Sequence, residues 1–177
     1  AARGHDVVPT IHCEDFTDDK LAAWFKAHDT RRLVLKPAIG ANAVDTFVVA
    51  RDDASLRQTE LLRATFDAGR AFLVQPFIES ICDRGEFSLF FFDGAYSHAI
   101  SKVPKRGDFR VQEEHGGAIA AVEAPQELRT VAAAVFADLD PVPVYGRGDW
   151  VCGPDGRYLL MELELIEPSL YLRTDPD

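Results

Sequence analysis

The stretch Tyr158–Tyr171 constrains the fold of this chain more than any other segment, because it combines an apolar strand with regularly spaced acids. Successive side chains of a strand point to opposite faces, so Glu162 and Glu164 share one face. Like charges on one face repel each other, and partial burial strengthens the repulsion, which favours a cation between the two carboxylates. Oxygen-only ligation of this kind suits a hard cation such as Mg²⁺. The alternative is that both glutamates face water on a solvated sheet.

The same alternation assigns apolar side chains to both faces of this strand. It places Leu160 and Ile166 on the face of the two glutamates, and it places four residues on the other face: Leu159, Met161, Leu163 and Leu165. A second strand is predicted at 145–151, and the turn Gly153-Pro154-Asp155-Gly156 joins the two strands into a hairpin. Asp149 can then lie beside the glutamates, which favours a cation site over a solvated sheet.

Composition limits the class of protein. The chain has 177 residues, of which 47% are hydrophobic and 27% charged, enough for one or two closely packed subdomains with a real core. Its net charge of -10 argues against nucleic acid as a main partner, because binding a phosphate backbone requires a basic face. Over most of the chain the acids fit a solvated surface. The sequence begins at Ala1 rather than Met, so we expect a piece of a longer polypeptide.

The cysteines and the hydropathy pattern predict a soluble cytoplasmic protein. Cys13, Cys82 and Cys152 are few and odd in number, and their spacing suits neither a disulfide framework nor a zinc site. No apolar run approaches the roughly 18 to 20 residues of a membrane span, and the N-terminus lacks the features of a signal peptide. We therefore expect three reduced thiols and no membrane association.

A lysine near the end of a second predicted strand is the next candidate. The strand 32–37 reads Arg-Leu-Val-Leu-Lys-Pro, and desolvating the ammonium of Lys36 costs several kcal/mol unless an anion compensates it. The small residues 38–43, including Gly40, follow, and their backbone amides can close over phosphates. A strand predicted at 46–50 returns from this loop, which forms a hairpin. The alternative is a lysine at a strand edge whose ammonium reaches solvent.

The remaining segments predict helices and short strands. Thr17 is expected to cap a helix at 17–28, and Asp53 or Ser55 a helix that ends near residue 68. Pro125 begins a helix whose core stripe consists of Leu128, Val131, Val135 and Leu139. Further strands are predicted at 7–11, 71–75, 86–92, 96–103 and 118–123.

Three further features bear on a possible site. The segment 75–79, Gln-Pro-Phe-Ile-Glu, is typical of a connector whose free backbone groups contact a purine edge, although a plain strand exit has the same composition. The basic loop 104–112 could hold an anion or form a solvated turn; its cations and those beside it are Lys102, Lys105, Arg106 and Arg110. His98 and His115 fit structural roles. The polar segment 79–85 is the best internal boundary.

Six short motifs occur in the order that they have in one known family. They are Leu-Val-Leu-Lys-Pro with its small-residue loop, Gln-Pro-Phe-Ile-Glu, Gly-Glu-Phe-Ser, Gly-Asp-Phe-Arg with a later Gly-Gly, Gly-Arg-Gly-Asp-Trp-Val and Met-Glu-Leu-Glu. Over nearly its whole length the chain resembles the nucleotide-binding part of ATP-grasp ligases, most of all glutathione-synthetase-like and ribosomal-protein-glutamate-ligase-like members. It is especially similar to actinobacterial relatives ending in Glu-Leu-Glu-Leu-Ile-Glu-Pro-Ser, a group that includes D-cycloserine synthetase.

The resemblance implies the α+β (two-layer α/β) ATP-grasp fold, in which two subdomains with antiparallel sheets and helices clasp ATP between them. We expect the N-terminal subdomain at residues 1–78 and the C-terminal subdomain, with the metal site, at residues 79–177. Family members also carry an upstream domain that supplies part of the substrate site. We expect that domain to be missing from this sequence.

The resemblance also implies residues that bind the nucleotide. ATP phosphates would be contacted by Lys36, Lys102 and the loop that contains Gly40. The adenine pocket would be lined by Gln75, Phe77 and Ile78. The ribose hydroxyls would be received by Glu86.

The same resemblance implies the catalytic and metal-binding residues. Contacts to the phosphates or to an acyl phosphate would be made by Arg110 and Arg147, which with Lys102 are the catalytic candidates. Mg²⁺, or Mn²⁺ in its place, would be held by Asp149, Glu162 and Glu164. The family usually has asparagine at the position of Glu164, so this chain departs from the pattern there.

The implied reaction begins when a substrate carboxylate takes the γ-phosphate of ATP, and an amine then attacks the acyl phosphate to form an amide or peptide bond. Two alternatives remain open: an enzyme of the same fold that uses ATP to close a ring or to dehydrate, and a module that binds ATP without catalysis. The expected partners are ATP and a small amino-acid-like or carboxylate substrate, with no nucleic acid and no membrane. A homo-oligomer is compatible with the sequence.

Overall fold

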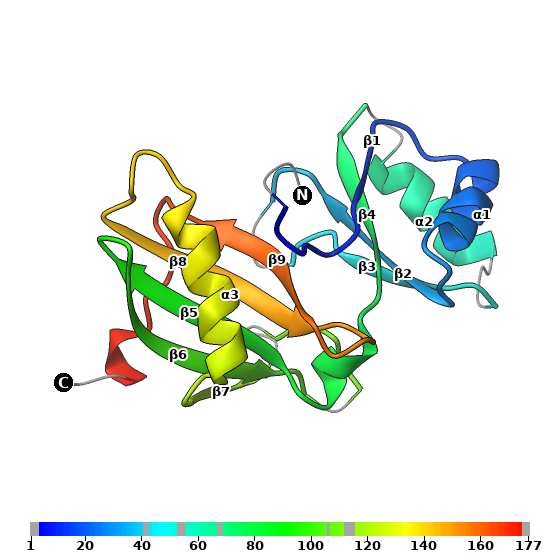
Figure 1. Cartoon of the computed structure of the whole chain (residues 1–177). Coiled ribbons are helices and arrows are strands. Elements are labelled where there is room, and N and C mark those ends of the chain that lie inside the picture. The colour runs from blue at the N-terminus through cyan, green and yellow to red at the C-terminus, as the bar shows by residue number, and fades with distance from the viewer. Residues whose placement is uncertain are drawn as a thin grey trace. The chain divides into compact units, whose positions relative to one another are not determined.

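The structure is a computed structural model that describes residues 4–40, 43–52, 56–66, 69–105, 107–111 and 116–174. Its contacts divide the chain into two compact units. The inserted unit is Val8–Phe77, and the flanking unit combines the segment up to Val7 with the chain from Ile78 onward. Figure 1 shows that each unit contains one sheet with helix beside it.

The inserted unit contains a four-stranded antiparallel sheet in the order β1-β4-β2-β3. Its strands are β1 (Ile11–Cys13), β2 (Arg32–Pro37), β3 (Phe47–Ala50) and β4 (Phe72–Pro76). Alternation along β2 sends Leu33 and Leu35 into the core, where both are fully buried. Val34 and Lys36 therefore lie on the opposite face of this sheet.

Two helices complete the inserted unit, α1 (Asp18–Ala27) and α2 (Leu56–Phe66). The side chain of Thr17 accepts a hydrogen bond from the backbone nitrogen of Lys20 at 3.2 Å, which satisfies one of the free N–H groups at the start of α1. The core between helices and sheet is rich in large apolar side chains, including Leu21, Trp24, Phe25, Leu62, Phe66 and Phe72. Burial of these side chains holds the helices on one face of the sheet.

The flanking unit contains a five-stranded antiparallel sheet in the order β7-β6-β5-β8-β9. Its strands are β5 (Glu86–Phe92), β6 (Ala95–Val103), β7 (Ala118–Ala121), β8 (Tyr145–Cys152) and β9 (Tyr158–Glu164). The helix α3 (Gln126–Ala137) buries Leu128, Ala132, Val135 and Phe136, and the first, second and fourth of these share a core with Trp150. Two short 3₁₀ helices, η1 (Glu79–Cys82) and η3 (Leu172–Thr174), complete the described elements of this unit.

The start of the chain adds to the edge of the flanking unit. Val7 forms a parallel bridge with Leu160 of β9, and the Leu160 nitrogen donates to the Asp6 carbonyl at 3.0 Å. The Asp6 carboxylate also pairs with Arg157 at 3.0 Å. The sequence predicts residues 1–78 as one subdomain, whereas these contacts join the segment up to Val7 to the other unit.

Most predicted elements are confirmed, including the capped helix at 17–28, the helix after Pro125 and the hairpins that carry the site residues. The core stripe of α3 is confirmed at Leu128, Val135 and Leu139, which are buried or pack against the core. Ala132 is buried where we expected Val131, and Phe136 is an additional core residue. The predicted caps Asp53 and Ser55 lie outside the described residues.

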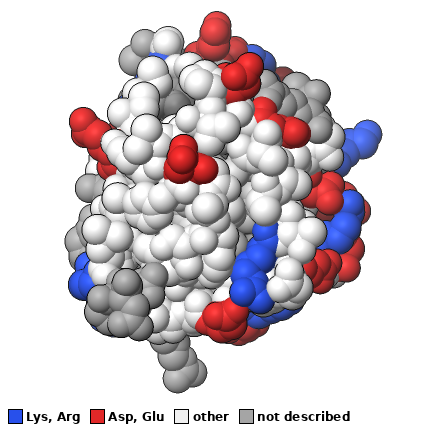
Figure 2. All heavy atoms as spheres, turned by 60° about the vertical axis from the view of Figure 1, so that its left-hand side comes forward, with Lys and Arg blue, Asp and Glu red and all other residues white. Residues whose placement is uncertain are grey.

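The surface and the cysteines add three observations. Within the part of the chain that the structure describes, no helix is long and apolar enough to cross a membrane. Cys13, Cys82 and Cys152 are all free, as the sequence predicts. Figure 2 shows a face that uncharged residues mostly cover, with acidic side chains dispersed among them, so the negative charge of the chain is not gathered there.

Candidate active site

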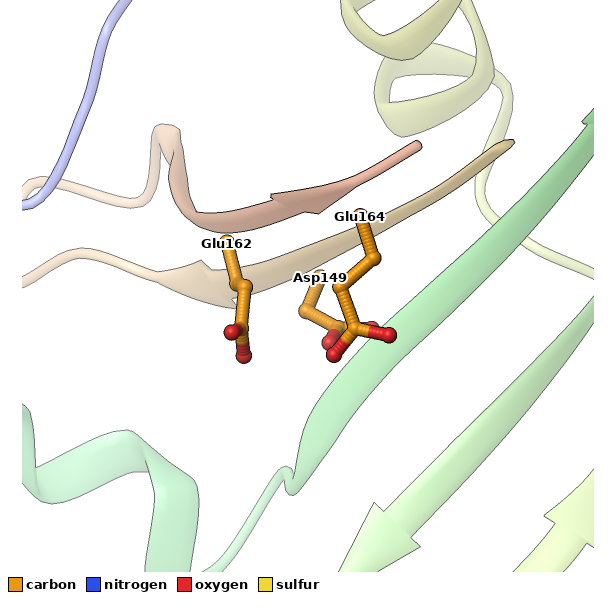
Figure 3. A group of neighbouring side chains, drawn as sticks. All are labelled: Asp149, Glu162 and Glu164. Atoms are coloured by element: carbon orange, nitrogen blue, oxygen red, sulfur yellow. The ribbon is translucent and has the colours of Figure 1, made fainter. Parts of the chain in front are cut away.

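The three predicted metal ligands lie together in the flanking unit. Asp149 on β8 pairs directly with Glu162 on β9, and Glu164 is two residues further along β9. Each offers a carboxylate oxygen, and these oxygens lie within 4.8 Å of one another. Figure 3 shows the three side chains extending from neighbouring strands toward the same side of the sheet. Because Asp149 is buried, Glu164 half-buried and Glu162 exposed, the group extends from the sheet to solvent.

A β-bulge in the hairpin of β8 and β9 sets which side chains share the face of the carboxylates. The register shifts between Asp149 and Trp150, so that Trp150 pairs with Leu160 instead of Met161. Leu160 therefore packs against the core of Trp150, while Glu162 remains beside Asp149. The strict alternation that the sequence predicts for this strand is wrong at Leu160, because the bulge turns the Leu160 side chain to the core face of the sheet.

Two glycines permit close approaches beside the site. A Cβ at Gly148 would lie 2.1 Å from Cη2 of Trp150, so the indole ring lies directly over this glycine. Gly85 has a φ of +74°, and a Cβ there would lie 2.7 Å from the Lys102 carbonyl oxygen. Glycine is the residue that tolerates both conditions. Gly85 thus allows β5 to start with Glu86 directly opposite Lys102.

Arg147, buried on β8, contacts two of the three carboxylates. Its Nε donates to the two Asp149 oxygens at 3.0 and 3.2 Å, and its Nη2 donates to Asp149 at 2.9 Å and to Glu164 at 2.6 Å. Its Nη1 donates to the Ser169 carbonyl at 3.5 Å. Burial lowers the pKa of Arg147, but the carboxylates, Asp149 first, raise it above its ordinary value. The guanidinium is therefore a permanent cation in the site.

A second buried ion pair joins β5 and β6. Lys102 Nζ donates to Glu86 at 3.0 Å and lies 3.5 Å from Asp149, to which the Ser88 hydroxyl also donates. Burial lowers the pKa of Lys102, but the carboxylates of Glu86 and Asp149 raise it above its ordinary value. Burial, with a smaller contribution from Asp149, raises the pKa of Glu86 to about 7 although Lys102 opposes the shift. Lys102 therefore stays charged, and Glu86 takes up a proton as the pH falls below about 7.

The charges on this face of the sheet favour a divalent cation. Two cations, Lys102 and Arg147, face four carboxylates, which are Glu86, Asp149, Glu162 and Glu164. When all are ionised, the group has a formal charge of two negative units. Its donors are oxygen atoms only, which is the ligand set that Mg²⁺ prefers. These residues therefore fit a Mg²⁺ ion.

The segment after β9 contributes contacts that the sequence pattern did not indicate. His98 of β6 lies 3.0 Å from the Leu170 carbonyl oxygen, and its ring stacks on Phe90 with 4.3 Å between centroids. Tyr171 lies against the same Phe90 ring, at 6.2 Å between centroids. In the sequence only the Pro168-Ser169 pair marked this segment, and that pair indicated no role for Ser169. His98 and Leu170 are 72 residues apart, so local patterns cannot relate them.

Arg110 lies in an ion pair of its own. Its Nε and Nη2 donate to the Asp108 carboxylate at 3.1 and 2.8 Å. These hydrogen bonds lower the pKa of Asp108 well below its ordinary value. In the described structure this bidentate pair engages Arg110 locally, and no hydrogen bond joins it to the carboxylates of the sheet. Arg106 and His115 lie outside the described residues.

Lys36 and Gly40 lie in the inserted unit. β2 is an interior strand, and Lys36 is half-buried opposite Leu73 of β4. Lys36 therefore does not lie on an edge strand, and exposure of its ammonium to solvent stays an open alternative. Among the described residues, no carboxylate pairs with Lys36. Gly40 is exposed, and residues 41–42 of its loop lie outside the described residues.

The residues predicted to line an adenine pocket lie at the end of the inserted unit and just beyond it. Gln75 is buried on β4 and donates to the Thr10 hydroxyl at 2.9 Å. Phe77 is buried, and the guanidinium of Arg32 lies 4.1 Å from its ring centroid. Ile78 is half-buried and is the first residue after the inserted unit. Two predicted site residues are thus held by contacts within the inserted unit.

The sequence and the fold together match one known family. Residues 7–151 match the family model of the prokaryotic glutathione synthetase ATP-grasp domain. This chain belongs to that ATP-grasp family. The matched region includes Lys36, Lys102, Arg147 and Asp149, and it ends before Glu162 and Glu164 on β9.

Two comparisons identify a similar protein. The chain is 35% identical over 200 residues to the cycloserine biosynthesis protein DcsG of Streptomyces lavendulae, which covers 100% of this chain and 62% of the relative. The crystal structure of D-cycloserine synthetase DcsG has a TM-score of 0.83 and 33% identity, over 98% of this chain and 61% of that one. The chain thus spans about three fifths of the relatives that it matches.

More distant structures share the fold alone. D-alanine-D-alanine ligase from Bacillus anthracis has a TM-score of 0.68 and 21% identity, over 98% of this chain and 55% of that one. The ATP-grasp ligase PsnB, solved with a minimal precursor, Mg and ADP, has a TM-score of 0.64 and 17% identity, over 99% of this chain and 50% of that one. The predicted ATP-grasp fold is confirmed.

Proposed function

We propose that this chain is the ATP- and Mg²⁺-dependent part of a ligase that joins a carboxylate to an amine. The observation that carries the proposal is the arrangement of Asp149, Glu162 and Glu164 beside the buried cations Lys102 and Arg147, in a member of the ATP-grasp family. Oxygen ligands for a hard cation next to fixed positive charges are what phosphoryl transfer requires.

The reacting groups are assigned to the flanking unit. Lys102 and Arg147 would neutralise the charge that spreads over the phosphoryl oxygens during transfer, and their burial makes this stabilisation stronger than it is in water. A bound Mg²⁺, or Mn²⁺ with its similar preference for oxygen, would supply electrostatic stabilisation of phosphate oxygens. Glu86 would receive the ribose hydroxyls, and Arg110 would contact a phosphate after leaving Asp108.

The nucleotide-binding residues are assigned mainly to the inserted unit. Lys36 would contact ATP phosphates, because its ammonium has no carboxylate partner among the described residues and the small-residue loop with Gly40 follows it. Gln75, Phe77 and Ile78 would line the adenine pocket. Adenine would then pack against the apolar side chains, and backbone groups would supply its polar contacts.

In the proposed reaction, a carboxylate oxygen of the substrate attacks the γ-phosphorus of ATP, and the bond to the ADP oxygen breaks. An amine nitrogen then attacks the acyl carbon, the bond from that carbon to the phosphate oxygen breaks, and the amine loses a proton. The products are an amide, ADP and inorganic phosphate. No side chain of the chain acts as a nucleophile, so catalysis rests on positioning and electrostatics.

The test uses the protein with any upstream residues that belong to it naturally, together with ATP, Mg²⁺ and a panel of amino acids and carboxylates. Hydroxylamine traps an acyl phosphate as a hydroxamate, so ADP release accompanied by a hydroxamate supports the proposal. Asp149→Asn should abolish both signals. If neither this longer protein nor the 177-residue chain shows a melting-temperature shift at millimolar ATP and Mg²⁺, the proposed site is wrong.

The relative with 35% identity favours a second candidate, because it is a cycloserine biosynthesis protein and cycloserine is a ring compound. In this reading the same site activates a group that is then attacked within one molecule, or lost by dehydration. Mass spectrometry of the product separates the two candidates, since ligation adds the masses of two substrates and cyclisation does not. Stabilisation by ATP without any ADP release would instead indicate a non-catalytic ATP-binding module.

The proposed partners are ATP and a small amino-acid-like or carboxylate substrate. The net charge of -10 disfavours nucleic acid, and the three free cysteines support a reducing compartment such as the cytoplasm. We also propose that the protein forms a homo-oligomer. Light scattering coupled to size-exclusion chromatography, with and without ATP, measures its mass directly.

A further inference from the structure

Arg147 contacts the same oxygen atoms that a divalent cation would use. Its Nε and Nη2 donate to both Asp149 oxygens and to one Glu164 oxygen, at distances from 2.6 to 3.2 Å. Asp149 and Glu164 are two of the three residues whose oxygens lie within 4.8 Å of one another. A carboxylate oxygen that accepts two charge-assisted hydrogen bonds has less capacity left for a cation.

The identity of residue 164 strengthens this contact. An amide side chain at this position would carry no charge. Glu164 instead forms an ion pair with Arg147 at 2.6 Å, and both side chains are at least half-buried. A charge-assisted bond to a guanidinium is roughly twice as strong as a neutral one. Glu164 therefore gives Arg147 a second carboxylate partner.

We propose that Arg147 is an internal counter-ion that competes with the divalent cation for Asp149 and Glu164, so that metal binding releases the guanidinium toward an anionic group of the substrate. This inference rests on the proposed function for the identity of that group. The competition itself depends only on the contacts of Arg147. It is a property of the chain and a cation, without nucleotide.

The third nitrogen of Arg147 keeps the released guanidinium in the site. Nη1 donates to the Ser169 carbonyl at 3.5 Å, on the segment that His98 holds through the Leu170 carbonyl at 3.0 Å. When Nε and Nη2 leave the carboxylates, the side chain can turn about this contact. Its freed donors then form a fork suited to a carboxylate or a phosphate. Metal binding and anion binding thus become positively coupled.

The first experiment titrates Mn²⁺ into the nucleotide-free chain and follows free Mn²⁺ by electron paramagnetic resonance. Arg147→Gln should bind Mn²⁺ on the order of ten times more tightly than wild type, because Arg147 no longer competes with the metal for the carboxylate oxygens. A tenfold change in affinity is the same free energy as a shift of about one pKa unit. Arg147→Lys keeps the charge but loses the fork, so it should lie between the two. Arg157→Gln, which removes an exposed arginine paired with Asp6 and Asp155, should match wild type.

The second experiment combines the two partners. Glu164→Gln should weaken Mn²⁺ binding more in the Arg147→Gln background than in wild type, because in wild type Arg147 already occupies this carboxylate. Equal effects in the two backgrounds would contradict the competition. Circular dichroism melting of each variant checks that the flanking unit remains folded.

A third measurement follows the Arg147 side chain of the wild-type chain by nuclear magnetic resonance. A variant is needed only to assign its resonance. The Nε–H resonance of Arg147, identified by its loss in Arg147→Lys, should shift on addition of Mg²⁺, and its exchange with water should accelerate several-fold. An unchanged resonance at saturating Mg²⁺ would overturn the proposal.

Two outcomes of the titrations would also overturn it. Equal affinity of wild type and Arg147→Lys would show that only the charge matters, without competition for the oxygen atoms. No binding to Arg147→Gln at millimolar Mn²⁺ would show that the freed carboxylates form no cation site. Failure of the proposed function looks different, because the chain would then bind Mn²⁺ as described but show no stabilisation by ATP.

Discussion

Lys36 and Lys102 occupy equivalent positions in two sheets, yet their surroundings differ. Each lies on an interior strand of an antiparallel sheet. Lys102 is buried opposite Glu86, at 3.0 Å, with Asp149 at 3.5 Å. Lys36 is half-buried opposite Leu73, and the described residues offer it no carboxylate. The flanking unit therefore supplies its own counter-charges, whereas the inserted unit leaves its cation available to a ligand.

This difference separates a structural charge from a binding charge. A buried ion pair fixes the geometry of a site, and removing one partner is costly because the other charge stays buried. A half-exposed cation keeps part of its hydration, so its removal changes the fold little and changes anion binding more. Each prediction below breaks or sharpens this contrast, from the largest expected effect to the smallest.

Replacing Lys102 by Met should produce the largest effect. It leaves the carboxylates of Glu86 and Asp149 buried without their cation, and breaking a buried pair in this way costs about 3 to 5 kcal/mol. The measurement is urea unfolding of the flanking unit, followed by the fluorescence of Trp150 in a Trp24→Phe background. A loss of unfolding free energy below about 1 kcal/mol would mean that the ion pairs of Lys102 contribute no more than exposed ion pairs do.

The two units should respond to pH in opposite directions. The folded pKa of Glu86 is about 7 against an ordinary value of 4.5, so the folded state holds a proton that the unfolded state has released. The free energy of unfolding of the flanking unit should therefore fall as pH rises from about 4.5 to about 7.

In the inserted unit the sign is reversed at His28. Burial lowers the pKa of His28 below its ordinary value of 6.5, so the unfolded state binds the proton more readily. The free energy of unfolding of this unit should fall as pH drops below about 6.5. Urea unfolding in EDTA with separate tryptophan reporters measures both slopes. Glu86→Gln should flatten the profile of the flanking unit alone; a persistent slope would assign it to another group.

Replacing Lys36 by Ala should change nucleotide affinity far more than stability. We expect a loss of affinity for Mg²⁺-ATP of about tenfold or more, because one charge-assisted bond to phosphate is removed. The free energy of unfolding should change by less than about 1 kcal/mol. Calorimetric titration of Mg²⁺-ATP checks the first value, with Lys26→Ala on the exposed face of α1 as the matched control. Equal affinities of both variants for Mg²⁺-ATP would mean that Lys36 does not contact the nucleotide and that its ammonium lies in solvent.

The smallest expected effect tests the independence of the two units. Thr17→Ala removes the cap of α1 and should cost the inserted unit about 1 kcal/mol. The flanking unit should be unchanged, because the two units have separate cores. Trp24 fluorescence, in a Trp150→Phe background, should report the loss, and the complementary reporter should not. A shift of both transitions would mean that the units unfold together.

The parts of this site that the sequence predicts depend on local periodicity. The turn Gly153–Gly156 and the alternation on both of its sides place Asp149 beside Glu162 and Glu164, and the structure has this arrangement. The β-bulge that turns Leu160 into the core depends on where the Trp150 ring packs. That packing involves distant residues, so the period of two could not predict the bulge.

The contacts that the sequence did not predict join distant segments. His98 meets the Leu170 carbonyl across 72 residues, and Asp6 meets Arg157 across 151 residues. Arg147 was assigned to an anion through the family resemblance, but its pairing with Glu164 follows from two adjacent strands whose register the sequence leaves open. Ionic contacts of this kind become visible only when the sheet is assembled.

The insertion of one unit within the other has a consequence for synthesis of the chain. Residues 8–77 are contiguous, and all four strands of their sheet are complete once Pro76 has left the ribosome. The flanking sheet must wait, because Val7 at its edge pairs with Leu160, which is translated 153 residues later. At 5 to 20 residues per second, this delay is about 8 to 30 s. During this time Val7 lacks the strand that it pairs with in the folded chain, whereas the strands of the inserted sheet already have their partners.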